Sequence, residues 1–381
     1  MNIFETSKLK LIIKSPVHIG SFEQNKTRFE FIIYQNYLYP VSEDRLAKFL
    51  QSRNLIGDYC ARVEAEGHLF SLADFLKSKA ITLNESLLNE LSSGRKILLI
   101  ADAAKMQDYR PLIRDGFGNP YIPGSSIKGV IRTAILYKLL KMLKENSPDE
   151  FSEKIERRIS QDIDKKVDKK KLFDWANVEY FESMVLFNKT KTPHTDWLKM
   201  LKVSDAYCYE KLQTILIPVN ILKKEEIWRY KEEQQGKKTT IWIECIPENA
   251  VFEFDIHFDR SMLFEFVKQN SNISIPMDLS SIRDCITEWA QDLIKFEKKF
   301  LYSTSLRNWY ENNVCNFRIG FGSGMMGTTI LMLLNERLRA KIRNYAGIDR
   351  GEMLAPKSRR TFQRGSQMFP LGWCLLVSSI L

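Results

Sequence analysis

Histidine is scarce in this sequence, and its cysteines are not paired. The 381 residues include four histidines and six cysteines, and no two cysteines form a CxxC motif. Zinc sites and disulfide frameworks need these residues at short, repeated spacings. We therefore expect reduced and mostly buried thiols, with neither a bound metal nor a cofactor.

The sequence also lacks a secretory leader and a membrane-spanning run. Residues 1–8 contain no basic segment followed by an apolar one, and no apolar run reaches the roughly 20 residues that cross a bilayer. Hydrophobic residues make up 44% of the chain, with 23 phenylalanines, which excludes a largely disordered protein. We expect a soluble, cytoplasmic protein with no membrane partner.

Positive charge is in excess. Lys and Arg number 57 against 47 Asp and Glu, a formal net charge of +10, which favours a polyanionic partner such as a nucleic acid. A chain of 381 residues also exceeds one comfortable hydrophobic core. The charge-dense stretch from residue 144 to about residue 202 is the candidate boundary, which predicts domains over 1–202 and 203–381.

Both halves of the chain mix strand and helix patterns. In the first half, strands are expected over 9–14, 28–34, 37–40 and 97–100, with a hairpin around Gln35-Asn36, a helix after Ser42 and a helical insertion over 58–91. In the second half, strands are expected over 203–207, 214–219 and 371–377, a hairpin joins 240–246 to 251–258, and a helix spans 281–300. The pattern predicts an α+β protein with two ferredoxin-like (βαββαβ) domains and helical insertions.

A glycine turn opens a helix in the first half. Tyr121-Ile122 leads into Pro123-Gly124-Ser125-Ser126, after which apolar residues recur at helical spacing. Free N–H groups and the positive end of the helix dipole meet at such a position, so it suits an anionic oxygen. Lys128 and Arg132 lie four residues apart beside it and add mobile positive charge.

A second glycine turn spans residues 316–327 and contains Gly320, Gly322, Ser323, Gly324 and Gly327. With so little side-chain bulk, this backbone can approach a phosphate chain closely. The segment formally matches the dinucleotide-binding GxGxxG motif, but only 54 residues follow it, too few for a doubly wound sheet. A tight turn with no ligand remains an alternative.

Three further groups of residues are candidates for a site. His18 follows the first strand and is the best placed histidine for acid–base chemistry, although a histidine with a backbone partner is equally compatible. Asp255, His257 and Asp259 share one face of a strand, a pattern that a half-buried strand produces without any metal. The basic segment with Lys357, Arg359 and Arg360 is predicted to be a loop that clamps phosphates or is simply solvated.

These motifs together resemble the RAMP superfamily of CRISPR effector subunits. The resemblance rests on residues 121–129 (YIPGSSIKG) with Arg132, on His18-Ile19-Gly20, on Tyr39-Pro40-Val41-Ser42 and on the glycine loop over 320–327. Within the superfamily, the chain is most similar to the type III-A (Csm) subunits that cap the crRNA 3′ end.

The resemblance implies RRM-related domains that hold crRNA through its backbone, while base pairing reads sequence. It implies partners in the backbone RAMP subunit and the small helical subunit, and a role in crRNA 3′-end maturation through host nucleases. The residues it places on RNA are His18, Gly124, Ser125, Ser126, Lys128, Arg132, Gly320, Gly322, Ser323, Gly324, Gly327, Lys357, Arg359 and Arg360.

No catalytic residue is assigned, so a non-catalytic RNA-binding subunit is expected. Two alternatives stay open. One is a metal-independent repeat endoribonuclease of the same superfamily with His18 as general acid or base. The other is an enzyme that binds a small nucleotide.

Overall fold

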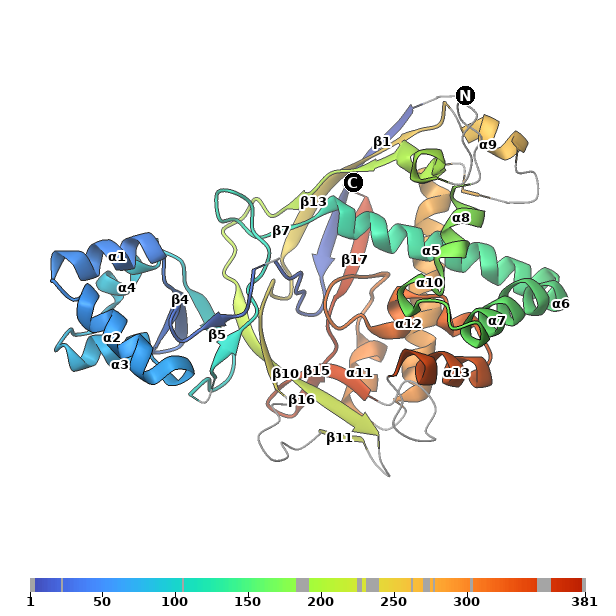
Figure 1. Ribbon diagram of the computed structural model, residues 1–381. Coiled ribbons are helices and arrows are strands. Elements are labelled where there is room, and N and C mark those ends of the chain that lie inside the picture. Colours follow the sequence, from blue (N-terminus) through green and yellow to red (C-terminus); the bar gives the residue numbers. More distant parts are fainter. Residues whose placement is uncertain are drawn as a thin grey trace.

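A computed structural model describes residues 4–21, 23–104, 106–182, 192–224, 228–230, 240–261, 263–269, 275–276, 278–301, 304–347 and 358–378. The described chain forms two larger sheets, a small two-stranded sheet, and helices that cover one of the larger sheets or form a separate lobe (Figure 1). The strands and helices predicted from the residue pattern are mostly present, but their partners differ from expectation in one important case.

The first sheet has seven strands, and each described pair of strands in it is antiparallel. Its order is β14-β17-β1-β13-β9-β7, and β8 also pairs with β13. The strands are β1 (Phe4–Ile13), β7 (Tyr121–Ile122), β8 (Leu201–Val203), β9 (Ala206–Tyr207), β13 (Val251–Asp259), β14 (Phe317–Arg318) and β17 (Trp373–Ser378). The sheet therefore takes strands from both sides of residue 202, and the predicted domain boundary there stays a prediction.

The second sheet has eight strands in the order β16-β15-β10-β5-β4-β3, with β11 and β12 also paired to β10. The strands are β3 (Phe31–Tyr34), β4 (Tyr37–Pro40), β5 (Ile97–Leu99), β10 (Ile215–Lys224), β11 (Trp228–Tyr230), β12 (Ile241–Cys245), β15 (Ser358–Arg364) and β16 (Gln367–Phe369). The predicted hairpin of β3 and β4 around Gln35-Asn36 is confirmed, and Gln35 has the positive φ of 52° that such a turn requires. The small third sheet pairs β2 (Lys26–Thr27) with β6 (Asp108–Tyr109).

The predicted hairpin between 240–246 and 251–258 is wrong. Both strands exist, as β12 and β13, but β12 pairs with β10 in the second sheet and β13 pairs with β1 in the first. Residues 247–250 thus carry the chain from one sheet to the other. The antiparallel partner of β13 comes from about 240 residues away in the sequence, where local turn signals carry no information.

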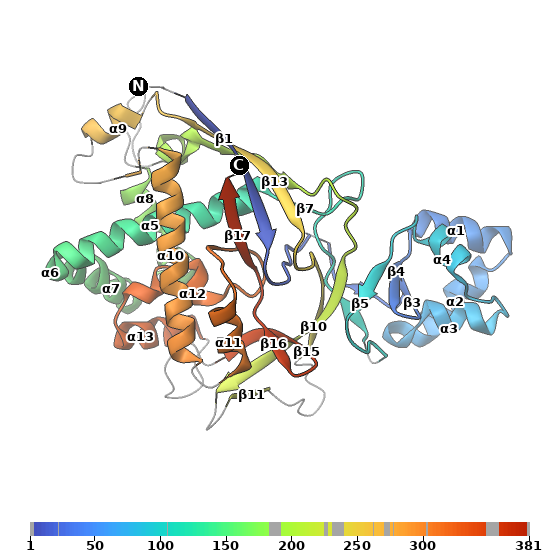
Figure 2. The same cartoon turned by 180° about the vertical axis from the view of Figure 1, so that it is seen from behind.

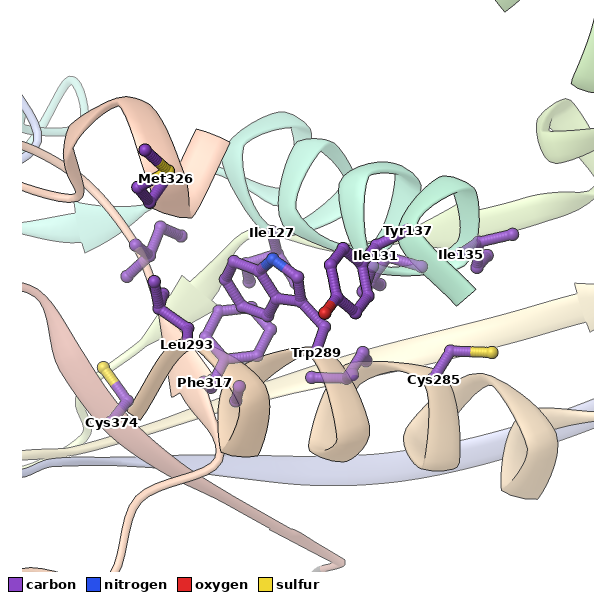
Figure 3. Close-up of a cluster of buried hydrophobic side chains, with 14 of the residues drawn as sticks. Ile127, Ile131, Ile135, Tyr137, Cys285, Trp289, Leu293, Phe317, Met326 and Cys374 are labelled. Atoms are coloured by element: carbon purple, nitrogen blue, oxygen red, sulfur yellow. The ribbon is translucent and has the colours of Figure 1, made fainter. Parts of the chain in front are cut away.

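Two long helices, α5 (Gly124–Asn146) and α10 (Leu279–Phe300), cover one face of the first sheet. Alternate residues of β13 point into this core, as the burial of Phe252, Phe254 and Ile256 shows. Figure 3 shows Ile127 and Ile131 of α5 facing Trp289 of α10 above the strands. The helix predicted over 281–300 is confirmed as α10, and the helix predicted at the first glycine turn is confirmed as α5.

The remaining helices fall into two groups. The first group is α1 (Glu43–Ser52), α2 (Ile56–Glu66), α3 (Leu72–Ser78) and α4 (Glu85–Leu91), a lobe with its own buried cluster beside β3 and β4 (Figures 1 and 2). The second group is α6 (Pro148–Phe151), α7 (Arg158–Asp164), α8 (Asp174–Tyr180), α9 (Leu263–Gln269), α11 (Ser305–Asn312), α12 (Gly324–Thr328) and α13 (Glu336–Ala346). Within the described residues, no helix is long and apolar enough to cross a membrane.

Candidate nucleic-acid interface

The first glycine turn is held against the first sheet. Gly124 begins α5, and its N–H donates to the Asp205 carboxylate at 2.7 Å. A Cβ on Gly124 would lie 2.3 Å from the carbonyl oxygen of Val203, so only glycine fits. The N–H that the sequence offered to a phosphate is therefore used inside the protein, and only the Ser125 side of the turn is exposed, with Ser126 half-buried.

The two cations beside this turn differ. Arg132 forms an ion pair with Asp196 and lies over the Phe181 ring, 4.4 Å from its centroid, so its charge is already compensated. Lys128 is half-buried, and burial lowers the pKa of its ammonium group. The structure therefore leaves Lys128 as the more available of the two for an external anion.

The second glycine turn is rigid. Gly320, Gly322 and Gly324 have φ values of 81°, 91° and 70°, which glycine adopts without strain. Arg318 lies beneath the turn and donates to the carbonyl of Gly322 at 2.9 Å, while the Ser323 hydroxyl donates to the carbonyl of Gly320 at 2.8 Å. Internal hydrogen bonds thus preset the shape of this loop.

Gly324 is exposed and Gly327 is buried against Leu293. The helix expected after the loop is divided into α12, a short 3₁₀ turn over Leu331–Leu333, and α13.

The structure brings His18 and the second glycine turn together. The Phe321 N–H donates to the His18 carbonyl at 2.8 Å, and a Cβ on Gly320 would lie 2.4 Å from that oxygen. The His18 and Phe321 rings meet edge to face with centroids 5.8 Å apart. Two segments some three hundred residues apart in the sequence therefore form one surface.

This surface borders a cavity of 440 Å³, lined by residues that include His18, Gly20, Glu23, Arg110, Gly320 and Phe321. His18 is only 3% exposed, and its Nδ1 donates to the Glu244 carbonyl at 2.7 Å. Because a carbonyl can only accept, the proton of the neutral ring lies on Nδ1 and leaves Nε2 as an acceptor, next to Gly20 of the cavity lining. Burial lowers the pKa of His18, which favours this neutral form.

Two arginines flank the Phe321 ring. The guanidinium carbons of Arg110 and Arg360 lie 5.3 Å and 4.8 Å from its centroid. Desolvation lowers the pKa of Arg360, and the like charge of Arg110 lowers it further. Within the described part of the chain, neither guanidinium has a carboxylate partner. The pair is thus a local excess of positive charge on an aromatic platform.

Buried Glu244, which is 0% exposed, holds this surface in place from below. Its carboxylate accepts from Arg114, from the Thr214 hydroxyl at 2.8 Å and from the Leu112 N–H at 3.0 Å. Its backbone accepts from His18 and donates to the Arg110 carbonyl at 2.9 Å. One residue at the end of β12 therefore fixes both His18 and the segment that carries Arg110.

The C-terminal basic segment is a strand and not the predicted loop. Residues 358–364 form β15, in which Thr361 and Phe362 are buried, because β15 pairs with both β10 and β16. Arg359 pairs with Glu297 at 2.6 Å, and Arg360 reaches Phe321. Lys357 lies outside the described residues.

Sequence reasoning missed Arg110 and the role of Phe321. Arg110 belongs to no motif, and its partners Ile243 and Phe321 lie more than a hundred residues away in the sequence. The sequence around Phe321 did give a weak indication of a binding role. A large aromatic side chain between two glycines of a turn is exposed unless another part of the protein or a ligand packs against it. For Asp255, His257 and Asp259, no group of three or more potential metal ligands exists within the described residues.

Comparisons with known proteins agree with these motifs. The sequence profile of the RAMP superfamily matches residues 10–325. A protein named CRISPR system Cms protein Csm5 from Streptococcus thermophilus is 27% identical over 269 residues, which cover 67% of this chain and 64% of that protein. A protein of the same name from Enterococcus italicus is 27% identical over 153 residues, 34% of this chain and 42% of that protein. The aligned part of the chain thus spans less than two thirds of these relatives.

Two solved structures share the fold. One is a chain in the cryo-EM structure of a Csm-crRNA-target RNA ternary complex of a type III-A CRISPR-Cas system, with a TM-score of 0.70, 21% identity, and coverage of 98% of this chain and 100% of that chain. The other is the crystal structure of T. onnurineus Csm5, with a TM-score of 0.64, 18% identity, and coverage of 96% and 99%. At these identities the likeness concerns the fold.

Proposed function

The chain belongs to the RAMP superfamily, and from this we propose that it is a crRNA-binding structural subunit that caps the 3′ end of a type III-A CRISPR effector complex. Its partners are crRNA, the backbone RAMP subunit and the small helical subunit of the same complex. In this role it contributes to crRNA 3′-end maturation, through host nucleases, and to antiviral defence. The names of its relatives and its likeness to a Csm complex chain support this assignment.

The topology of the first sheet and its two helices supports a ferredoxin-like fold. Along the chain, β1, α5, β8 with β9, β13, α10 and β17 follow the order strand, helix, strand, strand, helix, strand. In the sheet, β17, β1, β13 and β9 are neighbours in that order, and both helices cover one face. This order of elements and strands supports a ferredoxin-like βαββαβ unit.

The observation that carries the proposal is the meeting of His18, Arg110 and Phe321 at one cavity, with Arg360 packed over the same Phe321 ring. Guanidinium groups bind phosphate oxygens through several parallel donors, and they need no particular base. The Nε2 of neutral His18 can accept from a ribose 2′-hydroxyl, which distinguishes RNA from DNA. The surface therefore suits the backbone of an RNA strand whose sequence is read by pairing.

Positioning, and not chemistry, is the role we assign to these residues. His18 is held by the backbone of Glu244 and packed against Phe321, so its ring contributes an acceptor in a fixed place. Labelled repeat RNA incubated with the purified chain in EDTA is expected to stay intact. Cleavage that disappears in His18→Ala would instead assign the chain to the nuclease alternative.

Crosslinking within the assembled complex tests the placement. The chain would be co-expressed with the other type III-A subunits and a CRISPR array, and the purified complex irradiated with ultraviolet light. We expect the peptide that contains Phe321 to crosslink to nucleotides in the 3′ part of discrete repeat-derived crRNAs. Phe321→Leu should reduce that crosslink and leave assembly intact. Crosslinks confined to the 5′ part, or a complex that excludes the chain, would contradict the proposal.

A further inference from the structure

A second, smaller cavity is lined by residues 322–326, the part of the glycine loop that follows Phe321. It has a volume of 200 Å³, and the residues that line it include Glu297, Arg318, Gly322, Ser323, Arg359 and Arg360. These come from α10, β14, the loop and β15, all parts of the chain that the structure describes. Arg360 is shared between this cavity and the Phe321 platform. The cavity adjoins the proposed RNA surface without being part of it.

Arg359, which lines this cavity, has one buried donor without a hydrogen-bond partner among the described residues. Its side chain is 9% exposed, its Nε donates to Glu297 at 2.6 Å, and its Nη1 donates to the Ser358 carbonyl at 3.1 Å. The remaining donor is Nη2, and the guanidinium carbon lies 4.8 Å from the centroid of the Phe300 ring. A buried charged donor without an acceptor is costly, so it favours an anion as a ligand.

Arg318 provides an independent second observation. It is 3% exposed, and its donors reach only carbonyl oxygens, those of Gly322 at 2.9 Å and Leu371 at 3.3 Å. Its guanidinium carbon also lies 5.0 Å from the centroid of the Trp373 ring. Within the described residues no carboxylate pairs with it. A buried charge that is compensated only by dipoles favours a nearby anion.

The charges around the cavity set the charge of its ligand. Arg318, Arg359 and Arg360 contribute +3 and Glu297 contributes −1, which leaves +2. A backbone phosphodiester carries one negative charge, whereas a phosphomonoester approaches two at neutral pH. We propose that this cavity binds a phosphomonoester, the terminal phosphate of an RNA strand whose backbone lies on the adjacent Phe321 platform. The inference rests on the proposed function, because that function supplies the RNA.

The test compares three RNAs of one sequence on the full-length chain: one with a 3′-phosphate, one with a 5′-phosphate and one with hydroxyls at both ends. We expect one terminal phosphate to tighten binding at least about tenfold, equivalent to about 1.4 kcal/mol. The preferred end identifies which terminus occupies the cavity.

Arg359→Lys keeps a cation opposite Glu297 but removes the free Nη2. It should reduce the preference to about threefold or less while RNA with hydroxyl ends binds as before. Arg364→Lys is the matched control, because this arginine lies on the same strand and pairs with Glu248 outside the cavity.

The outcomes separate this proposal from the function on which it rests. Equal affinity for all three RNAs overturns the terminal-phosphate site and leaves RNA binding intact. A loss of affinity in Arg359→Lys that is the same for all three RNAs also overturns it, because that result assigns the cavity to an internal phosphodiester. No binding of any RNA overturns the proposed function itself. If Arg359→Lys fails to fold, Arg360→Gln, which alters an exposed side chain, must lower the preference for the inference to stand.

Discussion

Removing the two arginines that flank Phe321 should weaken RNA binding mainly at low salt. Neither the Arg110 nor the Arg360 guanidinium has a carboxylate partner within the described residues, so Arg110→Gln with Arg360→Gln disrupts no ion pair there. The double substitution does remove the cation–π interaction of each arginine with Phe321, worth about 0.5–1 kcal/mol at an exposed site. The fold should therefore survive, as thermal unfolding can verify.

The expected magnitude follows from counterion release. Each phosphate contact with single-stranded nucleic acid contributes about 0.7 to the slope of log affinity against log salt. If each arginine makes one contact, the double variant loses about 1.4 from that slope. Between 50 and 500 mM salt, the affinity gap between the original chain and the variant should then shrink by about 25-fold.

Filter binding of a labelled single-stranded repeat RNA with hydroxyl ends measures this slope. Arg62→Gln is the control for a charge lost elsewhere, because it removes one positive charge from α2 in the helical lobe, where Arg62 pairs with Glu66 (Figure 1). We expect its slope to equal that of the original chain. A double variant with unchanged slope and affinity, or a control that changes equally, would refute the reasoning that places RNA on the Phe321 platform.

Three further predictions concern the scaffold below this surface. Glu244→Gln leaves the Arg114 guanidinium without its buried carboxylate, so urea unfolding should show a loss of about 3–5 kcal/mol, whereas a loss below about 1 kcal/mol would mean that the pair is not stabilising. Gly372→Ala should cost at least about 1–3 kcal/mol, because Gly372 has φ of 82° and a Cβ there would lie 2.2 Å from the Ile319 carbonyl; an unchanged melting temperature would contradict this. The pKa of His18 is lowered from 6.5 in the folded chain, so the unfolded chain binds more protons just below pH 6.5 and stability should fall as pH drops from 6.5 towards the folded pKa. Above pH 6.5 this contribution should be flat, and His18→Gln should remove the part below it; an equally steep fall in the variant would assign the effect to other groups.

Local patterns predicted the elements of this fold better than their partners. The start of α5 at Gly124 and the span of α10 follow from helix signals that lie within a few residues of each other. The pairing of β13 with β1 does not, since a short turn such as residues 247–250 suits both a hairpin and a crossing between sheets. The residue pattern of β15 indicates a loop because three of its seven residues are arginines, although Thr361 and Phe362 are buried.

The candidate site was predictable only in part, for a related physical reason. The glycine loop and His18 carry local signals, but their contact depends on a hydrogen bond between residues 18 and 321. Arg110 and Arg360 reach the same ring from two other segments, and although Arg360 lies in a basic segment that the sequence marks, nothing near Arg110 marks it. A basic chain contains many Lys and Arg residues, and the sequence does not show which of them form ion pairs within the protein. Only the folded structure shows which cations lack such a partner.

Backbone hydrogen bonds to a strand hold the site in place. Isolated bridges join Val17 to Ile246 and Arg110 to Ile243, so the segments that carry His18 and Arg110 lie along β12 and its end. Glu244 lies between these bridges and anchors both segments through its own backbone. Groups that bind a flexible strand must be preset, because ordering them on binding would reduce the affinity. In the proposed function, Glu244 thus serves RNA binding by fixing the surface from below, without contacting RNA itself.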